Sequence, residues 1–539
     1  MEIMKINSII IVGGGSSGWF TASSLNKHIP EINVTLIESP NIPTVGVGES
    51  TNLNINWFLH HSLGMKDEDW MPHCDATYKG TIKFTDFYKK GEFFHFPFGL
   101  QDLSYTNIEN QSLGTDAWFF KKWLYPDTPQ TDFAESYWPV MQMINKNKVH
   151  LNEDNVIPNF NIETDWAYQF DATKLAHYMK TNLCSNTKHI SDHVTKVNLN
   201  GDGWISSLLT KEHGELKADL YIDCTGFNSM LLEKSLGVPH TSYEDTLINN
   251  GSWVTKLPYV DPNVEMEMTT NGTAIGNGWV WNIPLWNRIS SGYVYSNKFI
   301  DQAYALEEFK EHLKRTNQWC KDNNPHELEY RHIDIRAGIH NKAWYKNCLA
   351  IGLSYGFVEP LESQGLVATI EGIRKLIIVL QTKDRHVTEF DRECVNLEIK
   401  GEIEDNKYFI IYHYIGSIRD DTEYWKWYTQ ELEFDWEITQ NCFAYLSLCR
   451  FKHLTFTKTL PSLQCISIGH HINLYTDYTT KSQDGFMHYF NKCMSAGVEP
   501  IFEYWKERNK KISLLADKSP THFEYLKEKI YKKKVVVEK

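Results

Sequence analysis

The sequence predicts a mixed α/β fold with a parallel sheet at its centre and a helix-rich remainder. The first observation is the β-branched run Ser8–Val12, which passes through a glycine-rich turn into a helical stretch, Trp19–Asn26. The second is that residues 218–226 and 348–353 also run from an apolar strand into glycine. The third is the aromatic and helical character of the rest of the chain. Strands that alternate with helices form parallel sheets, so the three strand-glycine segments are expected to share one sheet.

The chain has 539 residues, which exceeds the usual size of a single hydrophobic core. We therefore expect two lobes built from interleaved segments. The strand-glycine segments assign residues 1–110, 165–240 and 325–385 to the first lobe. The second, helix-rich lobe takes residues 111–164, 241–324 and 386–539. Charged amphipathic helices are expected in it at Leu306–Arg315 and Glu503–Lys511.

Acidic residues outnumber basic residues by 68 to 54, which gives a formal net charge of -14. This balance is the opposite of the basic surface typical of nucleic-acid binding. The ten cysteines include no Cys-x-x-Cys pair and no secretory leader precedes the first strand, so we expect reduced thiols in the cytoplasm and no metal site. The apolar run Leu376–Leu380 is far shorter than the roughly 18 residues of a membrane span. We expect a cytoplasmic protein that binds neither nucleic acid nor membrane.

The turn after the first strand carries glycines at its first, third and sixth positions. Gly13 suits the turn, Gly15 lets the backbone approach a pyrophosphate, and Gly18 lets helix and strand pack closely. Ser16 and Ser17 then open the helix, whose free amides and positive end bind phosphate. The pattern predicts dinucleotide binding in a Rossmann-like lobe. The alternative is a glycine-rich turn in an ordinary α/β fold.

A second strand, 34–38, ends in Glu38, 20 residues beyond Gly18, where a carboxylate can accept hydrogen bonds from the adenosine ribose of a dinucleotide. The glycine pattern leaves FAD and NAD open, and two later features favour FAD. The later core strand ends in Thr225 and Gly226, near the same nucleotide, as expected when one long flavin dinucleotide spans a lobe. Before it, residues 190–197 suit a strand beside the adenine, with Val194 as a backbone contact.

A third segment runs from residue 348 through Pro360-Leu361-Glu362-Ser363 into a stretch of apolar residues at helical spacing. Ser363 is the expected N-cap of this helix. A helix N-terminus directed at a flavin ring can hold an anion such as a halide. The alternative is a capped helix without a ligand.

Residues 278–284 (Gly-Trp-Val-Trp-Asn-Ile-Pro) place two large aromatics at strand spacing. Alternation along a strand puts Trp279 and Trp281 on one face. The simplest interpretation is a strand in an aromatic-rich core, because the chain has 18 Trp, 28 Tyr and 27 Phe.

These motifs, together with residues 45–50 (Val-Gly-Val-Gly-Glu-Ser) and 76–84 (Ala-Thr-Tyr-Lys-Gly-Thr-Ile-Lys-Phe), resemble the flavin-dependent tryptophan halogenase family. The resemblance runs from about residue 7 to about residue 430. The motif Gly-Trp-x-Trp-x-Ile-Pro marks this family against the hydroxylating flavin monooxygenases. The resemblance implies an α/β, FAD-binding, flavin monooxygenase-type lobe with a helix-rich substrate-binding cap.

The resemblance also implies the chemistry and the partners. In such enzymes a separate flavin reductase supplies reduced FAD, and O2 and a halide ion then give hypohalous acid. That small oxidant is thought to travel to a lysine beside the aromatic substrate, and Lys79 matches this lysine. An ammonium at Lys79 would polarise the oxidant, whereas a chloramine needs the neutral amine, and the sequence leaves both open. A homodimer is also left open.

The remaining site residues follow the same resemblance. Glu362 matches the catalytic glutamate, which stabilises the arenium intermediate or takes its proton. Trp279 and Trp281 match the pair proposed to keep the organic substrate away from the flavin. Three further residues match flavin-contacting or coupling positions, namely Glu49, Leu353 and Ser363. The resemblance implies that backbone amides at Gln364 and Gly365 hold the halide, where the family commonly has Thr-Gly, so chloride, bromide and iodide all remain open.

The substrate is less defined by the sequence. His95 and Phe98 belong to a stretch, His95–Gly99, that resembles the family's indole-sandwiching segment with one extra residue. After Trp425 no match is found for the residues that hold the amino-acid group of tryptophan. We therefore expect an indole or a phenol, with free tryptophan as a further option. Two alternatives are an aromatic hydroxylase that reduces its FAD with NAD(P)H, and a flavin-binding protein without catalysis.

Overall fold

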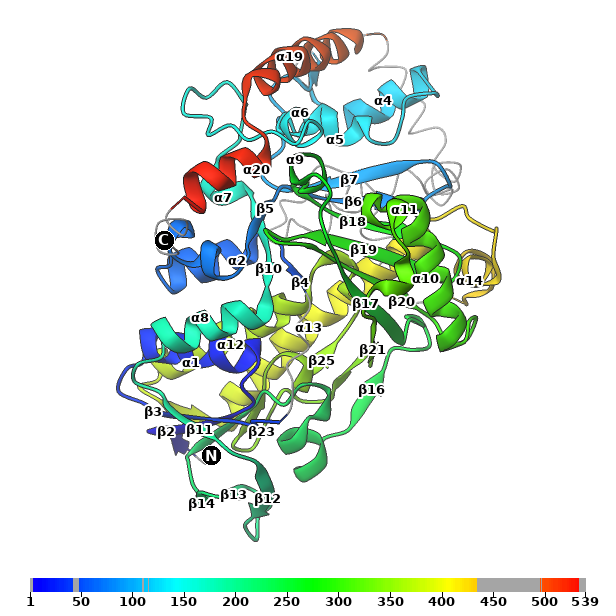
Figure 1. Cartoon of the computed structure of the whole chain (residues 1–539). Helices are drawn as coiled ribbons and strands as arrows, with labels where there is room; N and C mark the ends of the chain where they lie inside the picture. Colours follow the sequence, from blue (N-terminus) through cyan, green and yellow to red (C-terminus); the bar gives the residue numbers. More distant parts are fainter. Residues whose placement is uncertain are drawn as a thin grey trace.

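The computed structural model of the protein describes residues 3–41, 48–108, 111–114, 116–433, 495 and 497–532 (Figure 1). It is a mixed α/β structure with two large sheets, which confirms the predicted fold class. Val45–Val47 of the family segment, and 61 residues at 434–494 of the expected helix-rich lobe, lie outside the described residues.

The sheet predicted from the strand-glycine segments has six strands. Its order is β11 (Lys188–Ser191), β3 (Asn33–Glu38), β2 (Ser8–Val12), β15 (Leu220–Asp223), β24 (Cys348–Ala350) and β23 (Trp344–Tyr345). All neighbours pair in parallel except β23 and β24. Ile9 and Ile11 of β2 are completely buried, and full burial of such a side chain contributes about 1.5–3 kcal/mol. The β-branched run therefore forms a central strand, as its composition indicates.

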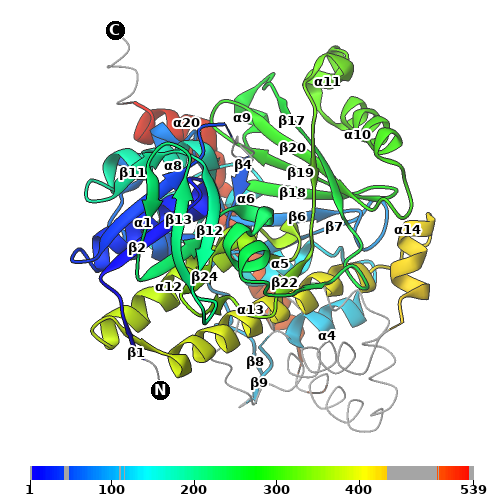
Figure 2. The same cartoon turned by 90° about the horizontal axis from the view of Figure 1, so that it is seen from below.

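Helices cover one face of this sheet. Figure 1 shows α8 (Ala172–Asn182), α1 (Ser16–His28) and α12 (Gly365–Thr382) side by side, and α1 contacts both of the others. The long helix α13 (Glu389–Ile415) packs along α12 (Figure 2). The start of α12 and the carboxyl ends of the parallel strands are thereby brought into one region.

The second large sheet has seven strands. Its order is β21 (Arg331–Asp334), β17 (Gly251–Leu257), β20 (Ile289–Tyr295), β19 (Gly278–Pro284), β18 (Thr269–Ala274), β6 (Thr81–Thr85) and β7 (Phe93–Pro97). Every pair is antiparallel except β18 with β6. The predicted tryptophan strand is therefore an interior strand, β19, flanked on both sides.

Smaller sheets connect these parts. The one that bears on the site is antiparallel, in the order β4 (Gly48–Ser50), β10 (Ala167–Asp171), β5 (Thr77–Lys79). The others are β12 (Val194–Leu199) with β13 (Ile205–Thr210) and β14 (Gly214–Leu216), β16 (His240–Ser242) with β22 (Gly338–His340) and β25 (Gly356–Phe357), β1 (Ile3–Lys5) with β26 (His386–Thr388), and β8 (Asn107–Ile108) with β9 (Gln111–Ser112).

Helices gather at the end of the molecule away from the six-stranded sheet (Figure 1). They include α4 (Asp116–Leu124), α5 (Asp132–Tyr137), α6 (Met141–Ile144) and α19 (Glu499–Lys518). The two predicted charged helices correspond to α10 (Gln302–Thr316) and α19, each longer than expected at both ends. Shorter helical segments are α2 (Asn54–Asn56), α3 (Asp67–Trp70), α7 (Ile162–Asp165), α9 (Pro262–Glu265), α11 (Gln318–Asp322), α14 (Glu423–Lys426) and α20 (His522–Tyr525).

Single turns of 3-10 or π helix complete the described elements. They are η1 (Trp57–Ser62), η2 (Met71–His73), η3 (Gly226–Asn228), η4 (Met230–Ser235), η5 (Pro325–Glu327), η6 (Gly352–Ser354), η7 (Pro360–Glu362), η8 (Trp427–Glu431) and η9 (Leu526–Ile530).

One prediction about the first lobe is wrong. A single strand was expected at residues 190–197, but β11 ends at Ser191 and β12 begins at Val194 in a different sheet. The break occurs where the Asp192 carboxylate accepts hydrogen bonds from the amides of His193, Glu212 and His213. A side chain that binds nearby amides competes with a strand ladder.

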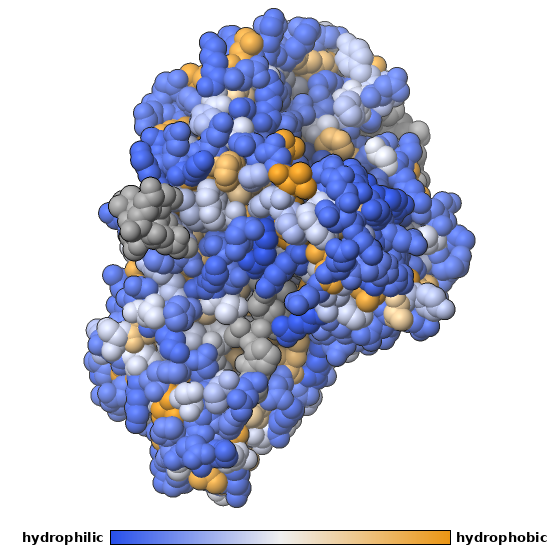
Figure 3. Space-filling view, viewed as in Figure 1, coloured by the Kyte–Doolittle hydropathy of each residue, from blue (hydrophilic) through white to orange (hydrophobic). Residues whose placement is uncertain are grey.

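The core and the surface agree with the composition. One continuous apolar cluster includes residues of both large sheets, among them Ile11 and Trp279. The face shown in Figure 3 is mostly hydrophilic, with apolar residues scattered over it.

Within the described ranges no helix combines the length and apolarity needed to cross a membrane. Six of the ten cysteines are described, and none of these six forms a disulfide.

Candidate active site

The turn between β2 and α1 requires glycine at two positions. Gly13 has a φ of 115°, and a Cβ there would lie 2.1 Å from the Cys224 carbonyl oxygen. At Gly18 a Cβ would lie 1.9 Å from the Gly13 carbonyl oxygen, because the helix packs directly on the turn. Around Gly15, in contrast, no other part of the described chain lies within 4 Å of a Cβ position. The backbone is therefore open to a pyrophosphate at Gly15, where α1 begins.

Ser16 and Ser17 form the first turn of α1. The Ser17 and Thr369 hydroxyl oxygens are 3.2 Å apart, which ties α1 to α12. A Cβ at Gly352 would lie 2.3 Å from the Ser17 Oγ, so the segment that carries Leu353 packs against the same turn. Three segments far apart in the sequence thus meet at the start of α1.

Glu38 ends β3 beside the turn. A Cβ at Gly14 would lie 2.4 Å from Glu38 Oε1, so the carboxylate lies against the glycine loop. Its Oε2 accepts hydrogen bonds from Lys180 Nζ at 3.2 Å and faces His189 Nε2 at 2.9 Å. Neither partner was found from the sequence, because α8 and β11 approach β3 only in the folded sheet.

Thr225, Gly226 and Leu353 follow the neighbouring strands β15 and β24 at the carboxyl edge of the parallel sheet. Gly226 has a φ of 67° and open space around it, like Gly15. Val194 lies near the same edge, because the Asp192 amide donates to the Glu38 carbonyl oxygen at 3.0 Å. Ligands of such sheets bind in the crevice outside the carboxyl ends of the strands. The open backbone and the ribose-type carboxylate therefore fit FAD.

Lys79, the last residue of β5, is completely buried. Its Nζ donates to the Thr51 carbonyl oxygen at 2.7 Å and to Ser363 Oγ at 2.9 Å. It also lies 5.1 Å from the centre of the Phe98 ring. The structure therefore brings together Lys79, Ser363 and Phe98, which are separated by up to 284 residues in the sequence.

Burial changes the ionisation of this lysine and of a neighbouring carboxyl group. Burial lowers the pKa of Lys79 from 10.5 to about 7, while the charges of Glu362 and Glu49 oppose the shift. Burial likewise raises the pKa of Glu49 from 4.5 to about 7, and here the charge of Lys79 opposes it. Both the ammonium and the neutral amine of Lys79 are thus accessible near neutral pH.

Glu362 ends the turn η7 and is 1 % exposed. Its Oε1 lies 2.7 Å from His413 Nε2, in α13. Sequence reasoning missed His413, since no local pattern marks a helical histidine 51 residues away as the partner of a glutamate. Lys79 and Glu362 belong to one buried cluster, because the charge of Glu362 acts directly on Lys79.

The prediction that Ser363 is the N-cap of the following helix is wrong. The helix α12 begins at Gly365, its N-cap is Gln364, and no side chain caps it. Ser363 instead has a φ of 59°, in the left-handed region that non-glycine residues rarely adopt. Its Oγ accepts from Lys79 and donates to Ser50 Oγ at 3.0 Å. Its side chain is therefore used in the cluster and cannot serve the helix.

Gln364 and Gly365 lie at the start of this 18-residue helix. A Cβ at Gly365 would be 3.5 Å from Glu49 Oε1, so Glu49 faces the positive end of the helix. Asn52 Nδ2 donates to Gln364 Oε1 at 3.3 Å, and no side chain caps the start of the helix. The helix start thus offers backbone donors for an anion.

Trp279 and Trp281 lie on one face of β19, as predicted, since both belong to the main apolar cluster and Val280 to a second one. Trp279 Nε1 donates to Glu359 Oε1 at 2.6 Å. Trp281 covers Gly292 of the neighbouring strand, where a Cβ would lie 2.4 Å from the indole ring.

Glu359 is a second buried carboxyl group, three residues before Glu362. Besides Trp279, Asn249 Nδ2 donates to its Oε1 at 3.1 Å, and the Tyr414 hydroxyl donates to the same oxygen. Burial is the main cause that raises its pKa. Trp279 is thereby tied to the segment that carries Glu362, a connection that the sequence did not reveal.

The two residues predicted to contact substrate lie in different surroundings. Phe98 follows β7 and lies near Lys79, 6.1 Å from the Phe96 ring. His95, inside β7, is opposite Lys83 of β6, and its Nδ1 is 3.4 Å from Thr81 Oγ1. Burial lowers the pKa of His95 to about 3, with the Lys83 charge adding to the shift. The structure brings Phe98 to the cluster and leaves His95 outside it.

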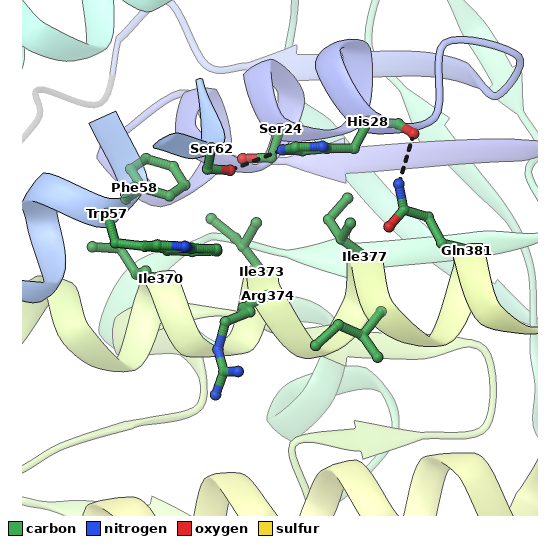
Figure 4. A pocket seen from close by; sticks show the side chains of 11 residues that line it. Ser24, His28, Trp57, Phe58, Ser62, Ile370, Ile373, Arg374, Ile377 and Gln381 are labelled. Carbon is green, nitrogen blue, oxygen red and sulfur yellow. Dashed lines mark hydrogen bonds between the residues drawn. The ribbon is translucent and has the colours of Figure 1, made fainter. Parts of the chain in front are cut away.

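A cavity of about 220 Å³ lies elsewhere, between α1, η1 and α12 (Figure 4). His28 bonds to Ser62 at 2.8 Å on its wall, and Gln381 donates to the His28 carbonyl oxygen at 3.1 Å. The lining residues are Ser24, His28, Trp57, Phe58, Ser62, Ile370, Ile373, Arg374, Ile377, Ile378 and Gln381. None of them is a predicted site residue, so this cavity is separate from the cluster around Lys79.

Known proteins resemble the chain over most of its length. Residues 8–455 match the tryptophan halogenase family. The tryptophan 6-halogenase SttH of Streptomyces toxytricini is 34% identical over 447 residues, which cover 79% of this chain and 81% of that protein. The tryptophan 7-halogenase RebH of Lentzea aerocolonigenes is 32% identical over 438 residues, 78% of each chain.

Solved structures agree with these matches. The apo structure of VirX1 has a TM-score of 0.85 at 37% identity and covers 98% of this chain and 99% of its own. The crystal structure of SttH has a TM-score of 0.80 at 28% identity, with 96% of this chain and 99% of its own covered.

Proposed function

The chain belongs to the tryptophan halogenase family, and from this membership we propose that it uses reduced FAD, O2 and a halide ion to halogenate an electron-rich indole or phenol. It is thus a flavin-dependent enzyme that relies on a separate flavin reductase. The observation that carries the site assignment is the buried cluster in which Lys79 and Glu362 interact and Ser363 holds the lysine amine.

The first part of the site binds the cofactor and the halide. The amides at Gly15, Ser16 and Ser17 take the pyrophosphate, and Glu38 takes the ribose. Bound reduced FAD, with O2, supplies the oxidising power that converts halide into hypohalous acid. The halide lies at the start of α12, where the amides at Gln364 and Gly365 and the positive helix end favour an anion.

The second part of the site directs the oxidant at the ring. Lys79 holds hypohalous acid beside the substrate, either by an ammonium hydrogen bond or by its neutral amine, since its pKa of about 7 permits both. Phe98 forms one wall of the substrate site. Electrophilic attack gives an arenium ion, and the Glu362 carboxylate stabilises this cation and accepts its proton.

Trp279 and Trp281 separate the two parts by their bulk. Their fixed positions support this role. Glu359 accepts a hydrogen bond from the Trp279 indole, and Gly292 leaves room for the Trp281 indole because it has no side chain. Such a partition admits O2 and halide to the flavin and excludes the aromatic substrate. An aromatic hydroxylase would need the opposite arrangement.

The names of the relatives bear on the substrate. SttH and RebH are named for tryptophan. For this chain we keep indoles and phenols as the proposed substrate class, and tryptophan is one of the indoles to be tested. The lobe division into 1–110, 165–240 and 325–385 against the rest, a cytoplasmic location and a homodimer are part of the same proposal.

A substrate and halide panel tests the function. The protein is combined with a flavin reductase, NADH, FAD, O2 and bromide, and offered indoles, phenols and tryptophan. We expect at least one product with the mass gain of bromine for hydrogen, by mass spectrometry. Absence of such a product across the panel, repeated with chloride and iodide, contradicts the proposal. NAD(P)H oxidation by the protein without the reductase would favour the hydroxylase instead.

A further inference from the structure

Glu362 has a buried partner to which the proposed chemistry assigns no role. His413, near the end of α13, is 2 % exposed, and its Nε2 lies 2.7 Å from Glu362 Oε1. Among the described residues, this is the one hydrogen bond recorded for the Glu362 carboxylate. The pair joins the longest described helix to the turn before α12.

The hydrogen bonds of His413 fix where its protons lie. Nδ1 is 2.9 Å from the Phe409 carbonyl oxygen, which can only accept, so Nδ1 carries a hydrogen. Nε2 must then either donate to Glu362 or accept from a protonated Glu362. With no proton between them, two lone pairs would face each other in a buried site, which is costly. The pair therefore holds one proton in addition to the one on Nδ1.

The charged neighbours of the pair favour its ion-paired form, and the apolar rings around it oppose that form by excluding water. The rings of Phe84, on β6, and Phe409, on α13, lie 4.8 Å and 4.9 Å from the imidazole and keep water away. The charged or ionisable groups that face the pair are Lys79, whose charge acts on Glu362, and Glu359, which His413 influences. A cation at Lys79 stabilises a carboxylate at Glu362, and a carboxylate stabilises an imidazolium at His413.

We propose that His413 is a positioning residue that donates its Nε2 hydrogen to Glu362 Oε1 and so keeps Glu362 ionised, with its other oxygen left for the substrate. The proposal rests on the proposed function of Glu362. When the arenium C–H bond breaks, its electron pair returns to the ring and the proton moves to the free carboxylate oxygen. The hydrogen bond to His413 holds the carboxylate in place before and after this transfer, and no further reactant is required.

Two substitutions test the hydrogen bond from His413 to Glu362. His413→Gln keeps an amide donor within reach of Oε1. His413→Leu removes the donor and retains an apolar side chain in the aromatic setting. Phe84→Leu is the matched control, because it removes a ring that packs on His413 and leaves the hydrogen bond. Each variant is compared with the wild-type protein on the panel substrate that the wild type converts best.

We expect His413→Leu to lower the halogenation rate by about 100-fold, within the range of general acid-base contributions. His413→Gln is expected to stay within about tenfold of wild type, because its amide hydrogen replaces the Nε2 donor to Glu362. Phe84→Leu should keep the wild-type rate. Hypohalous acid formation, measured with a chemical trap in the absence of substrate, should be unchanged in all three.

Three results would overturn the proposal. They are an unchanged rate in His413→Leu, a His413→Gln variant as impaired as His413→Leu, and a Phe84→Leu variant as impaired as His413→Leu. Nitrogen-15 histidine NMR of the wild-type protein gives an independent measure that needs neither a substrate nor a stable variant. We expect a protonated Nδ1 on a buried histidine, and its absence would also overturn the assignment. Failure of the function itself would instead appear as a wild-type protein that makes no product.

Discussion

The glycine turn after β2 and the cluster around Lys79, the two proposed binding regions, are built by opposite physical means. At the turn, selectivity comes from missing side chains, since Gly13 and Gly18 leave no room for a Cβ and Gly15 leaves room for a ligand. In the cluster, selectivity comes from ionisable side chains in a dry interior, where Lys79 and Glu362 are almost completely buried. The turn is built from consecutive residues, whereas the cluster joins residues from β5, η7 and α13.

This difference shows which part of a site depends on local and which on global structure. The steric requirements of a turn act within a few residues, so the effect of a substitution there has a local cause. The ionisation of Lys79 depends on everything that removes water from it, including segments almost 300 residues away. The cluster should therefore respond to changes in charge and pH, and the turn to changes in volume.

The largest expected effect is that of Lys79→Ala. Because the proposed role of the amine is to hold the oxidant beside the substrate, we expect halogenation to fall by a factor of about 10² to 10⁴. Reduced-flavin oxidation and hypohalous acid release should continue, since the FAD site is unaffected. Lys83→Ala is the matched control, because Lys83 lies on the adjacent strand β6 and packs over Phe93, outside the cluster. Equal loss in both variants would remove the special role of Lys79.

A pair of glycine substitutions tests the other region. Gly15→Ala adds a methyl group into open space, so we expect the fold to keep its thermal stability while FAD affinity falls at least about tenfold. Gly13→Ala forces a Cβ against the Cys224 carbonyl oxygen at an unfavourable φ, so stability and FAD affinity should both fall. Thermal unfolding and flavin fluorescence titration measure the two effects. If Gly15→Ala binds FAD normally, the open space is not the pyrophosphate site.

The sequence predicted the α/β fold and its main parallel strands well, because these depend on local patterns. β2, β15 and β24 were found as apolar strands that run into glycine, β3 from its acidic end, and β19 from its alternating tryptophans. The interval 190–197 was misjudged, since the Asp192 turn that divides it depends on amides of residues 212 and 213. Ser363 was misassigned as a cap because the sequence cannot show that its hydroxyl accepts a hydrogen bond from Lys79.

In the site, family motifs supplied residues such as Lys79 and Glu362 but not their environment. His413, Glu359 and Thr51 were missed, since each acquires its partner only when distant elements pack together. The burial that moves the pKa of Lys79 to about 7 is likewise a property of the whole fold. A motif can therefore indicate which side chain acts without indicating its charge.

The last and smallest effect concerns the dependence of stability on pH. The folded pKa of Lys79 is about 7 and its ordinary value is 10.5, so between these pH values the unfolded chain binds more protons than the folded one. Stability contributed by this group therefore rises with pH across that interval. Glu49 acts in a different window, because its pKa is raised from 4.5 to about 7 and its contribution falls with pH between those values.

Lys79→Met removes the first contribution and keeps a side chain of similar length. We expect the variant to lose the wild-type gain in unfolding free energy between neutral and alkaline pH, a difference on the order of one to a few kcal/mol. Urea unfolding at two pH values within the Lys79 interval measures it, and Lys83→Met supplies the control. If Lys79→Met gains stability with pH as steeply as the wild type, Lys79 ionises normally in the folded protein. The contrast between the two regions would then rest on geometry alone.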